Sequence, residues 1–244
     1  AKFANIVLAM TEGTRDKHLE NGLNKNKVYV IQNGTNIDHY YPLEFSIIEN
    51  FKKNVLNLPE NSIVFGFSGN ISKWQGVEDL VTASSALMND YPLYLLIIGY
   101  GNHLNEIKQR IKQLNLENRI ILKENIPYAE MNLWNNCIDV AFAPKVKSLD
   151  GFTSPLKIRD YAACGKPVIS TDIRGIKEFE PFGWLITYEL NKPNNLEDKM
   201  RAILKSKTKI AEMGKKAREY AEQCFSWDKV AQASIDIYVE KSTL

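Results

Sequence analysis

The feature that most constrains the fold of this chain is a series of six short apolar segments, each followed by a segment with helical periodicity. Two of them, LYLLII at 93–98 and VAFAP at 140–144, contain no charged residue. Strands that are apolar along their whole length are typical of a parallel sheet covered by helices on both faces. The pattern predicts an α/β fold, a doubly wound parallel sheet of the Rossmann-like kind, between about residues 63 and 205. The expected strands cover residues 63–67, 93–98, 119–122, 140–143, 168–170 and 184–187.

Both ends of the chain lie outside this alternation. Residues 1–42 contain two short strand-like runs around a helix that Thr11 caps, and we predict that they are the tail of a truncated N-terminal domain and a linker. Residues 43–244 are predicted to form one domain. It is expected to contain three further helices, near residues 44–56, 210–224 and 227–238. Since the chain begins in a strand-like run without Met, we interpret it as a piece of a longer protein.

Composition and charge argue against several classes of protein. A hydrophobic content of 44% and a charged content of 25% are ordinary for a globular domain, and a net charge of +2 is too small to indicate a nucleic-acid surface. No apolar run approaches the ~20 residues that a membrane helix needs, and no signal peptide opens the chain. These features favour a cytoplasmic protein.

The cysteines and histidines show no ligand spacing. We expect Cys137, Cys164 and Cys224 to be reduced core residues, because they lie far apart in apolar or helical segments. The three histidines are scattered along the chain. The sequence therefore predicts neither a disulfide framework nor a metal site.

Two glycine-containing loops follow expected strands, where doubly wound folds bind their ligands. The first, SGNISKWQG at 68–76, has Lys73 at its tip and leads into a helix. Glycines let a phosphate approach the backbone, and a helix N-terminus favours negative charge. The second, IIGYGN at 97–102, would let a ligand lie against the end of its strand. The alternative for the first loop is an ordinary strand–helix turn with one exposed lysine, and the second loop is equally well explained as a tight turn.

A third loop, ENIPYAEM at 124–131, has the features of a base-binding segment. Extended backbone at Asn125 and Ile126 would offer N–H and C=O groups to the edge of a base. The alternative is a simple strand exit with Pro127 as the first helical residue.

The segment SPLKIRDYAACGKPVIS at 154–170 combines a helix start with charged residues. Ser154 is expected to be the N-cap and Pro155 the first helical residue. Free N–H groups of residues 153–156 would then point toward the strand ends, where an anion can bind.

Lys157 and Asp160 of this helix are the most informative pair. A lysine in the first turn opposes the helix dipole, and a bound anion would remove that conflict. Asp160 lies about one turn further on and can face the same cleft. A carboxylate that accepts hydrogen bonds from two vicinal hydroxyls is a common way to hold a ribose. The alternative is a surface Lys–Asp pair, worth ~0.2–0.5 kcal/mol.

The order of these motifs resembles the C-terminal half of a GT-B glycosyltransferase of family four, also called group one. The resemblance extends over nearly the whole chain. It rests on VIQNGTNIDHYYP at 30–42, FGFSGNISKWQGVEDLV at 65–81, LLIIGYG at 95–101, the SPLK…GKPV segment at 154–168, and the ending FSWDKVAQASIDIY.

The resemblance implies a function and a set of site residues. Such enzymes transfer a sugar from a nucleotide-diphosphate sugar to an acceptor such as a growing glycan in polysaccharide biosynthesis. They need no metal or other cofactor and generally retain the anomeric configuration. The implied donor phosphate and sugar contacts are Gly69, Asn70, Lys73, Gln75, Thr153, Ser154, Pro155, Leu156 and Lys157. Asp160 would bind the ribose, Asn125, Ile126 and Pro127 the base, and Gly99 and Gly101 would line the cleft. No catalytic residue is implied.

Several positions depart from the family pattern. Asp160 stands where glutamate is usual, and Phe152 occupies the first position of the paired-glutamate motif. Asn70 and Gln75 stand where an Arg–Lys pair often binds phosphate, so Lys73 is the substitute we expect.

The resemblance implies an acceptor-binding N-terminal domain, of which we expect this chain to contain only the tail. We therefore expect the isolated chain to bind a nucleotide-sugar weakly and to be nearly inactive. Two alternatives stay open: a degenerate domain kept for nucleotide-sugar binding or assembly, and a sugar epimerase or phosphorylase of the same fold. The resemblance also leaves open a peripheral membrane association of the full-length enzyme, and it implies no nucleic-acid partner.

Overall fold

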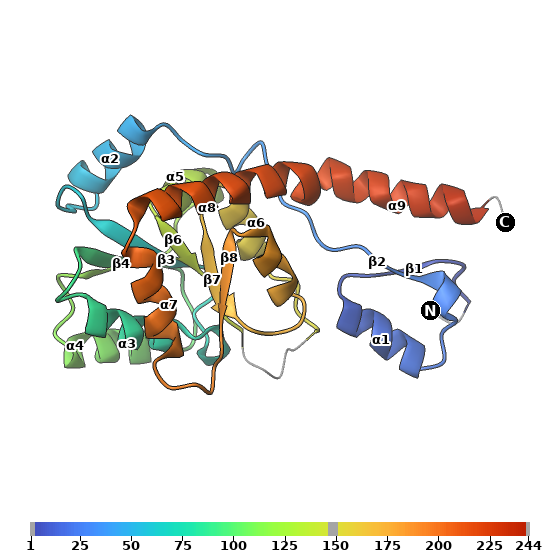
Figure 1. The fold of residues 1–244 in the computed structure, drawn as a ribbon, viewed down its shortest axis with the longest axis horizontal. Coiled ribbons are helices and arrows are strands. Elements are labelled where there is room, and N and C mark those ends of the chain that lie inside the picture. Colours follow the sequence, from blue (N-terminus) through green and yellow to red (C-terminus); the bar gives the residue numbers. More distant parts are fainter. Residues whose placement is uncertain (1–2, 146–150, 243–244) are drawn as a thin grey trace.

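A central sheet of six parallel strands organises the computed structural model, which describes residues 3–145 and 151–242 (Figure 1). Its strand order is β5-β4-β3-β6-β7-β8, so the chain winds outward in both directions from the β3–β6 pair. This confirms the predicted doubly wound α/β fold. The strands are β3 (Ile63–Ser68), β4 (Leu93–Ile98), β5 (Ile120–Lys123), β6 (Val140–Phe142), β7 (Val168–Thr171) and β8 (Leu185–Tyr188).

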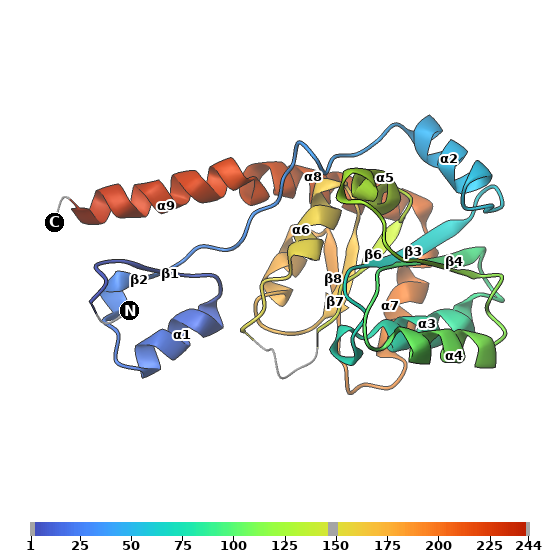
Figure 2. The ribbon, with the colours of Figure 1, turned by 180° about the vertical axis from the view of Figure 1, so that it is seen from behind.

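Helices cover both faces of this sheet and create two apolar cores (Figures 1 and 2). Successive strand residues point to opposite faces, so Val64 belongs to one core and Phe65 to the other. One face packs on α3 (Val77–Leu87), α4 (Leu104–Gln113) and α7 (Asn195–Leu204). The other packs on α2 (Phe45–Asn54), α5 (Met131–Asn136), α6 (Leu156–Ala163) and the end of α8 (Lys207–Tyr220). Burial on both faces explains why the strands read as continuous apolar runs.

Short helical turns complete the domain. These are η2 (Lys73–Gln75), η3 (Tyr128–Glu130), η5 (Lys177–Phe182) and the π-helical turn η6 (Ala221–Phe225). The predicted helix near 210–224 is thus an α-helix that ends at Tyr220 and passes into η6. The cysteine prediction is correct for Cys137 and Cys164, which are buried and free, but wrong for Cys224. Cys224 is exposed because η6 buries only Ala221 and Phe225.

The N-terminal residues form a small unit beside the domain. Two parallel strands, β1 (Val7–Ala9) and β2 (Val28–Val30), flank α1 (Glu12–Glu20) and η1 (Lys25–Lys27). Thr11 caps α1 as predicted, since its hydroxyl accepts a hydrogen bond from the Thr14 N–H at 3.1 Å. The unit contacts the domain through the Gly13 N–H, which donates to the Gly151 carbonyl. The boundary at residues 42 and 43 stays a prediction.

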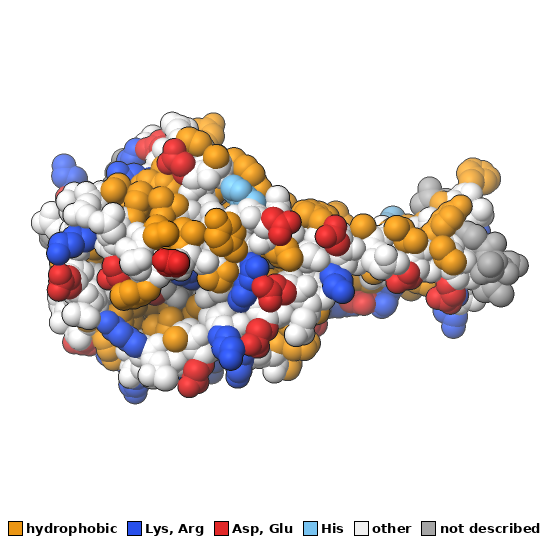
Figure 3. Space-filling view, turned by 90° about the horizontal axis from the view of Figure 1, so that it is seen from above, with side chains coloured by type: hydrophobic (Ala, Val, Ile, Leu, Met, Phe, Trp, Pro, Cys, Tyr) orange, Lys and Arg blue, Asp and Glu red, His pale blue; other side chains and the backbone are white. Residues whose placement is uncertain are grey.

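The last helix, α9 (Trp227–Ser242), projects away from the sheet and runs past the N-terminal unit (Figures 1 and 2). The linker after β2 runs along its start, where the Thr35 N–H donates to the Phe225 carbonyl at 2.7 Å. Acidic and basic side chains are interspersed on the face shown in Figure 3. In the part of the chain that the structure describes, no helix is both long and apolar enough to span a bilayer.

Candidate functional site

A cleft of about 460 Å³ opens where β3, β4 and β5 end, beside α6. It lies next to the β3–β6 pair, the place where doubly wound folds bind ligands. Seven of the predicted site residues line it, namely Gly69, Asn70, Gly99, Asn125, Ile126, Lys157 and Asp160. Tyr40, Ser68, Ile98, Tyr100, Met131 and Asn135 complete the lining. The extended backbone predicted at Asn125 is wrong, because its φ of 56° lies in the left-handed region.

The other predicted residues lie outside this lining. Lys73 is exposed, and Gln75 is buried, with its amide oxygen bound to the cleft-lining Lys157. Gly101 packs its backbone against Ile71, and Pro127 precedes η3. The remaining four, Thr153, Ser154, Pro155 and Leu156, lead into α6 without lining the cleft.

The predicted cap of α6 is wrong. The N-cap is Pro155, which contributes no side-chain hydrogen bond, and the helix begins at Leu156. The Ser154 hydroxyl is buried and has no partner among the described residues. Pro155 keeps an extended backbone, with ψ of 118°, so the helix starts one residue later than the sequence indicates.

Two glycines form the floor of the cleft by direct backbone contact. Gly69 and Gly99 have φ of 134° and 142°, a region that favours glycine. The Gly69 N–H donates to the Ile98 carbonyl at 2.9 Å, and a Cβ added to Gly99 would overlap the Gly69 carbonyl. The two loops can approach this closely only because both positions are glycine. At these positions the backbone, and no side chain, faces the cavity.

Gly99→Ala should therefore destabilise the fold by about 3 kcal/mol or more, because it adds a clash to backbone strain. Urea unfolding measures the loss. Gly22→Ala is the matched control, since Gly22 also has positive φ, 83°, but a Cβ there meets no atom within 4 Å. Equal losses in the two variants would contradict the backbone contact at Gly99.

Lys157 crosses the floor of the cleft above Gly69. Its Nζ donates to the Gln75 Oε1 at 3.1 Å and lies 3.7 Å from the centroid of the Phe67 ring. Burial lowers the pKa of Lys157 well below its usual value, repulsion from Lys145 adds to this, and Asp160 opposes it. The Lys157 ammonium is thus held in a partly desolvated position at the carboxyl end of β3.

Asp160 faces the same cleft from the next turn of α6. Its Oδ1 accepts a hydrogen bond from the Thr35 hydroxyl of the linker at 2.5 Å. Burial raises the pKa of Asp160 to about 6, opposed by the Thr35 hydrogen bond and by the charges of Arg159, His39 and Lys157. The alternative of a surface pair is wrong, because Lys157 and Asp160 form no ion pair with each other.

Sequence reasoning missed Asn135, which faces the proposed base segment. Only 1% of this residue is exposed, yet its amide oxygen has no hydrogen-bond partner among the described residues. It lies one turn after Met131 on α5, so both side chains reach the cleft. An asparagine at a buried helix position is the signal that could have identified it.

Tyr161 was missed as well, and it fixes the end of β3. Its hydroxyl accepts a hydrogen bond from the Ser68 N–H at 2.6 Å and lies 3.0 Å from the Ser68 hydroxyl. The side chain is fully buried, and this contact ties α6 to the loop that starts at Gly69. Among the described residues, no group of three or more His, Cys, Asp or Glu side chains could hold a metal.

The sequence of this chain matches the model of a known family. The family model described as "Glycosyl transferases group 1" matches residues 48–221, which is more than half of the chain. The chain belongs to the group 1 glycosyl transferases. This confirms the resemblance noted in the sequence.

Curated relatives of this glycosyl transferase chain are distant. It is 24% identical over 233 residues to an uncharacterized glycosyltransferase of Methanocaldococcus jannaschii, covering 93% of this chain and 56% of that protein. It is also 24% identical over 248 residues to the alpha-maltose-1-phosphate synthase of Mycolicibacterium smegmatis, covering 96% and 63% respectively. The chain thus spans about three fifths of the length of these glycosyltransferases.

Solved structures share the fold of this glycosyl transferase domain. Sucrose-phosphate synthase from Thermosynechococcus elongatus superposes with a TM-score of 0.80 at 21% identity, covering 98% of this chain and 59% of that one. Anabaena HepE in complex with UDP-glucose gives 0.79 at 22% identity, covering 100% and 65%. The agreement confirms the predicted C-terminal, Rossmann-like domain of the GT-B architecture.

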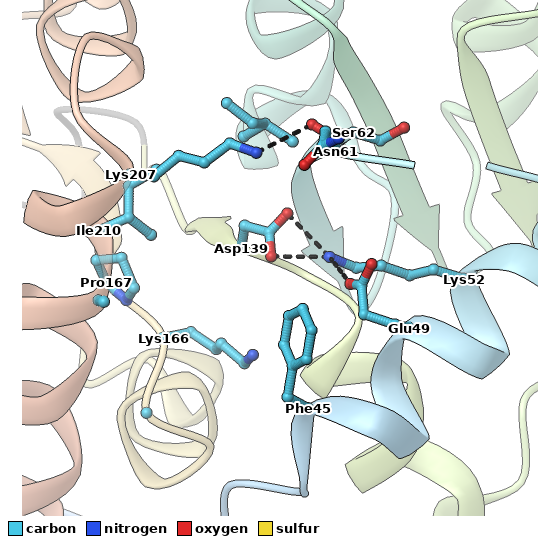
Figure 4. A pocket seen from close by; sticks show the side chains of 13 residues that line it. Phe45, Glu49, Lys52, Asn61, Ser62, Asp139, Lys166, Pro167, Lys207 and Ile210 are labelled. Atoms are coloured by element: carbon cyan, nitrogen blue, oxygen red, sulfur yellow. Dashed lines mark hydrogen bonds and ion pairs between the residues drawn. The ribbon is translucent and has the colours of Figure 1, made fainter. Parts of the chain in front are cut away.

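A second pocket of the glycosyl transferase domain, about 330 Å³, lies at the amino ends of β3, β6 and β7 (Figure 4). Its lysines already have partners within the protein. Lys52 donates to Asp139, Lys166 to the Asn136 carbonyl at 2.7 Å, and Lys207 to the Asn61 carbonyl at 3.2 Å. The lysines of this pocket are therefore bound to groups of the protein itself. In the cleft at the carboxyl ends of the strands, by contrast, the Asn135 amide oxygen has no hydrogen-bond partner among the described residues.

Proposed function

We propose that this chain is the donor-binding part of a glycosyltransferase that moves a sugar from a nucleoside-diphosphate sugar to an acceptor such as a growing glycan. The observation that carries the proposal is the placement of Lys157 and Asp160 in one cleft at the carboxyl ends of the strands. An ammonium there suits a phosphate, and a carboxylate suits the two hydroxyls of a ribose. The likeness to Anabaena HepE, solved in complex with UDP-glucose, supports it.

The cleft would contribute to the transfer reaction mainly by electrostatic stabilisation. When the bond between sugar and diphosphate breaks, negative charge develops on the departing diphosphate. Lys157 and the open backbone at Gly69 stand where that charge would gather. Asp160 would hold the ribose with the oxygen that Thr35 does not use, while the base lies against Ile126 and Met131. We propose that transfer needs no metal and retains the anomeric configuration.

The isolated chain should bind its donor weakly and turn over little of it. Each charge-assisted contact contributes on the order of 1.5–3 kcal/mol, and association costs consume much of the sum. Two or three such contacts support dissociation constants from roughly high micromolar to millimolar. Transfer would also need an acceptor site, which we propose lies in another part of a longer protein. Any peripheral contact with a membrane would likewise belong to that longer protein.

One observation favours a degenerate, non-catalytic domain as the second candidate. Phe152, in the loop before α6, has 54% of its surface exposed and offers no hydrogen-bonding group to a sugar. Donor turnover by the longer protein separates the two candidates. A protein that binds the nucleotide but never consumes the donor would be the degenerate form.

Calorimetric titration of the chain with UDP, GDP and ADP tests the proposal, first without metal and then with magnesium. We expect one diphosphate to bind saturably and magnesium to leave its affinity unchanged. Failure of all three to bind up to millimolar concentration would contradict a donor site in this chain.

A further inference from the structure

Two lysines from different parts of the chain converge on a single neutral oxygen atom. Lys145 lies in the loop after β6, three residues beyond its last residue, Phe142, and its Nζ donates to the Gln75 Oε1 at 3.2 Å. Lys157 donates to the same oxygen at 3.1 Å. Lys145 and Gln75 are 6% and 4% exposed, so little water reaches this contact.

The charges of this pair are not balanced. No carboxylate of the described residues forms an ion pair with Lys145 or Lys157, and Lys145 otherwise lies 4.3 Å from the centroid of the Trp74 ring. Burial lowers the pKa of Lys145 to about 8, and its charge helps to lower that of Lys157. Two ammonium groups that share one amide oxygen, one buried and one half-buried, are costly, and an anion between them would remove most of that cost.

We propose that Lys145 is a second phosphate-binding residue of the donor cleft, and that Lys145 and Lys157 together hold the diphosphate of the nucleotide. This inference rests on the proposed function. A phosphate oxygen would replace the Gln75 oxygen between the two ammonium groups. Rotation of the Gln75 amide by half a turn would then present its NH₂ group to the same phosphate.

The position of Lys145 in the fold fits this role. It stands where β6 ends, next to the cleft that opens at β3, and its own N–H donates to the Thr171 hydroxyl at 3.0 Å. That bond fixes the backbone of Lys145 beside the carboxyl end of β7. The positive charge that positions 70 and 75 lack would thus come from the loop after β6, whereas the expected substitute, Lys73, is exposed.

The test is a titration of Lys145→Met with the diphosphate that the wild-type chain binds and with the matching nucleoside. We expect diphosphate affinity to fall by about tenfold or more and nucleoside affinity to stay within about twofold. Lys145→Arg should keep most of the affinity. Lys112→Met, which removes the same charge from an exposed site on α4, should behave as wild type.

Gln75→Glu gives an independent readout that a purely structural role would not produce. A carboxylate at this position would pair with both lysines, so the variant should unfold at a higher temperature than wild type. The same carboxylate would occupy the phosphate position, and diphosphate affinity should fall by about tenfold or more with nucleoside affinity unchanged.

The outcomes separate this inference from the proposed function. If the wild-type chain binds none of UDP, GDP and ADP, the proposed function fails and this inference fails with it. If the wild type binds but Lys145→Met and Gln75→Glu bind equally well, only the role of Lys145 is overturned. Equal losses of diphosphate and nucleoside affinity in Lys145→Met would also overturn it, because the residue would then only support the fold.

Discussion

Asp160→Asn should make the fold more stable and nucleotide binding weaker. Burial raises the pKa of Asp160 to about 6, so the ionised carboxylate destabilises the folded state at neutral pH. An amide removes that cost and can still accept the Thr35 hydrogen bond, so we expect a gain of roughly 1–3 kcal/mol in the free energy of unfolding at pH 7. Urea unfolding of both proteins measures it.

The pH dependence of this gain has a definite sign. Because the folded-state pKa lies above the ordinary value of 3.8, the folded protein binds more protons than the unfolded chain between about pH 4 and 6. The cost of the carboxylate is therefore fully present above pH 6 and disappears below about pH 4. The advantage of Asp160→Asn over wild type should shrink as the pH falls through this window, and an advantage that grows would contradict the account.

Nucleotide binding should change in the opposite direction. An amide accepts hydrogen bonds from ribose hydroxyls less strongly than a carboxylate, and we expect a loss of about 1–3 kcal/mol, or roughly tenfold to a hundredfold in affinity. For the same reason, the nucleotide affinity of the wild type should rise between pH 5 and 7, because Asp160 becomes ionised over this range. Asp38→Asn, at an exposed carboxylate of the same linker region, is the control that should change neither quantity.

Asp139→Ala should produce the largest loss of stability. The Asp139 carboxylate precedes β6 and accepts hydrogen bonds from the Lys52 ammonium at 2.9 and 3.1 Å and from the Val64 N–H at 2.7 Å (Figure 4). Lys52 is only 6% exposed, and its other partner, Glu49, lies 3.6 Å away. Removing the carboxylate leaves a buried ammonium poorly paired, which costs about 3–5 kcal/mol. Urea unfolding tests this.

A second variant distinguishes the ion pair from general disruption. Lys52→Met combined with Asp139→Asn removes both charges while the amide oxygen can still accept from the Val64 N–H. It should recover at least half of the loss. A cost below about 1 kcal/mol for Asp139→Ala would contradict the buried pair. Nucleotide affinity of the double variant should match wild type, since this pocket lies at the opposite end of the strands from the cleft.

The sheet could be predicted well because its physical signature is local. Burial on both faces demands continuous apolar runs, and every expected strand lies within one residue of the observed bounds at each end. Helix α6 was placed within one residue of its observed start, Leu156, although its cap was wrong. Pro155 and Ser154 both suit a helix start, and only the folded backbone decides which residue caps it.

The site could be predicted only in part because its decisive contacts are far apart in the sequence. The partner of Asp160 is Thr35, 125 residues away, and Lys145 meets Gln75 across 70 residues. A local motif can place Lys157 and Asp160 on one helix face, because that spacing is a property of the helix. It cannot reveal which side chains the fold brings to meet them.

The most direct test of the central claim is a crystal structure of this chain with the diphosphate that it binds best. We expect the ribose hydroxyls at Asp160, the base beside Ile126, and the diphosphate over Gly69 in contact with Lys157. A nucleotide bound elsewhere, for example among the lysines of the pocket in Figure 4, would contradict the assignment of the donor cleft.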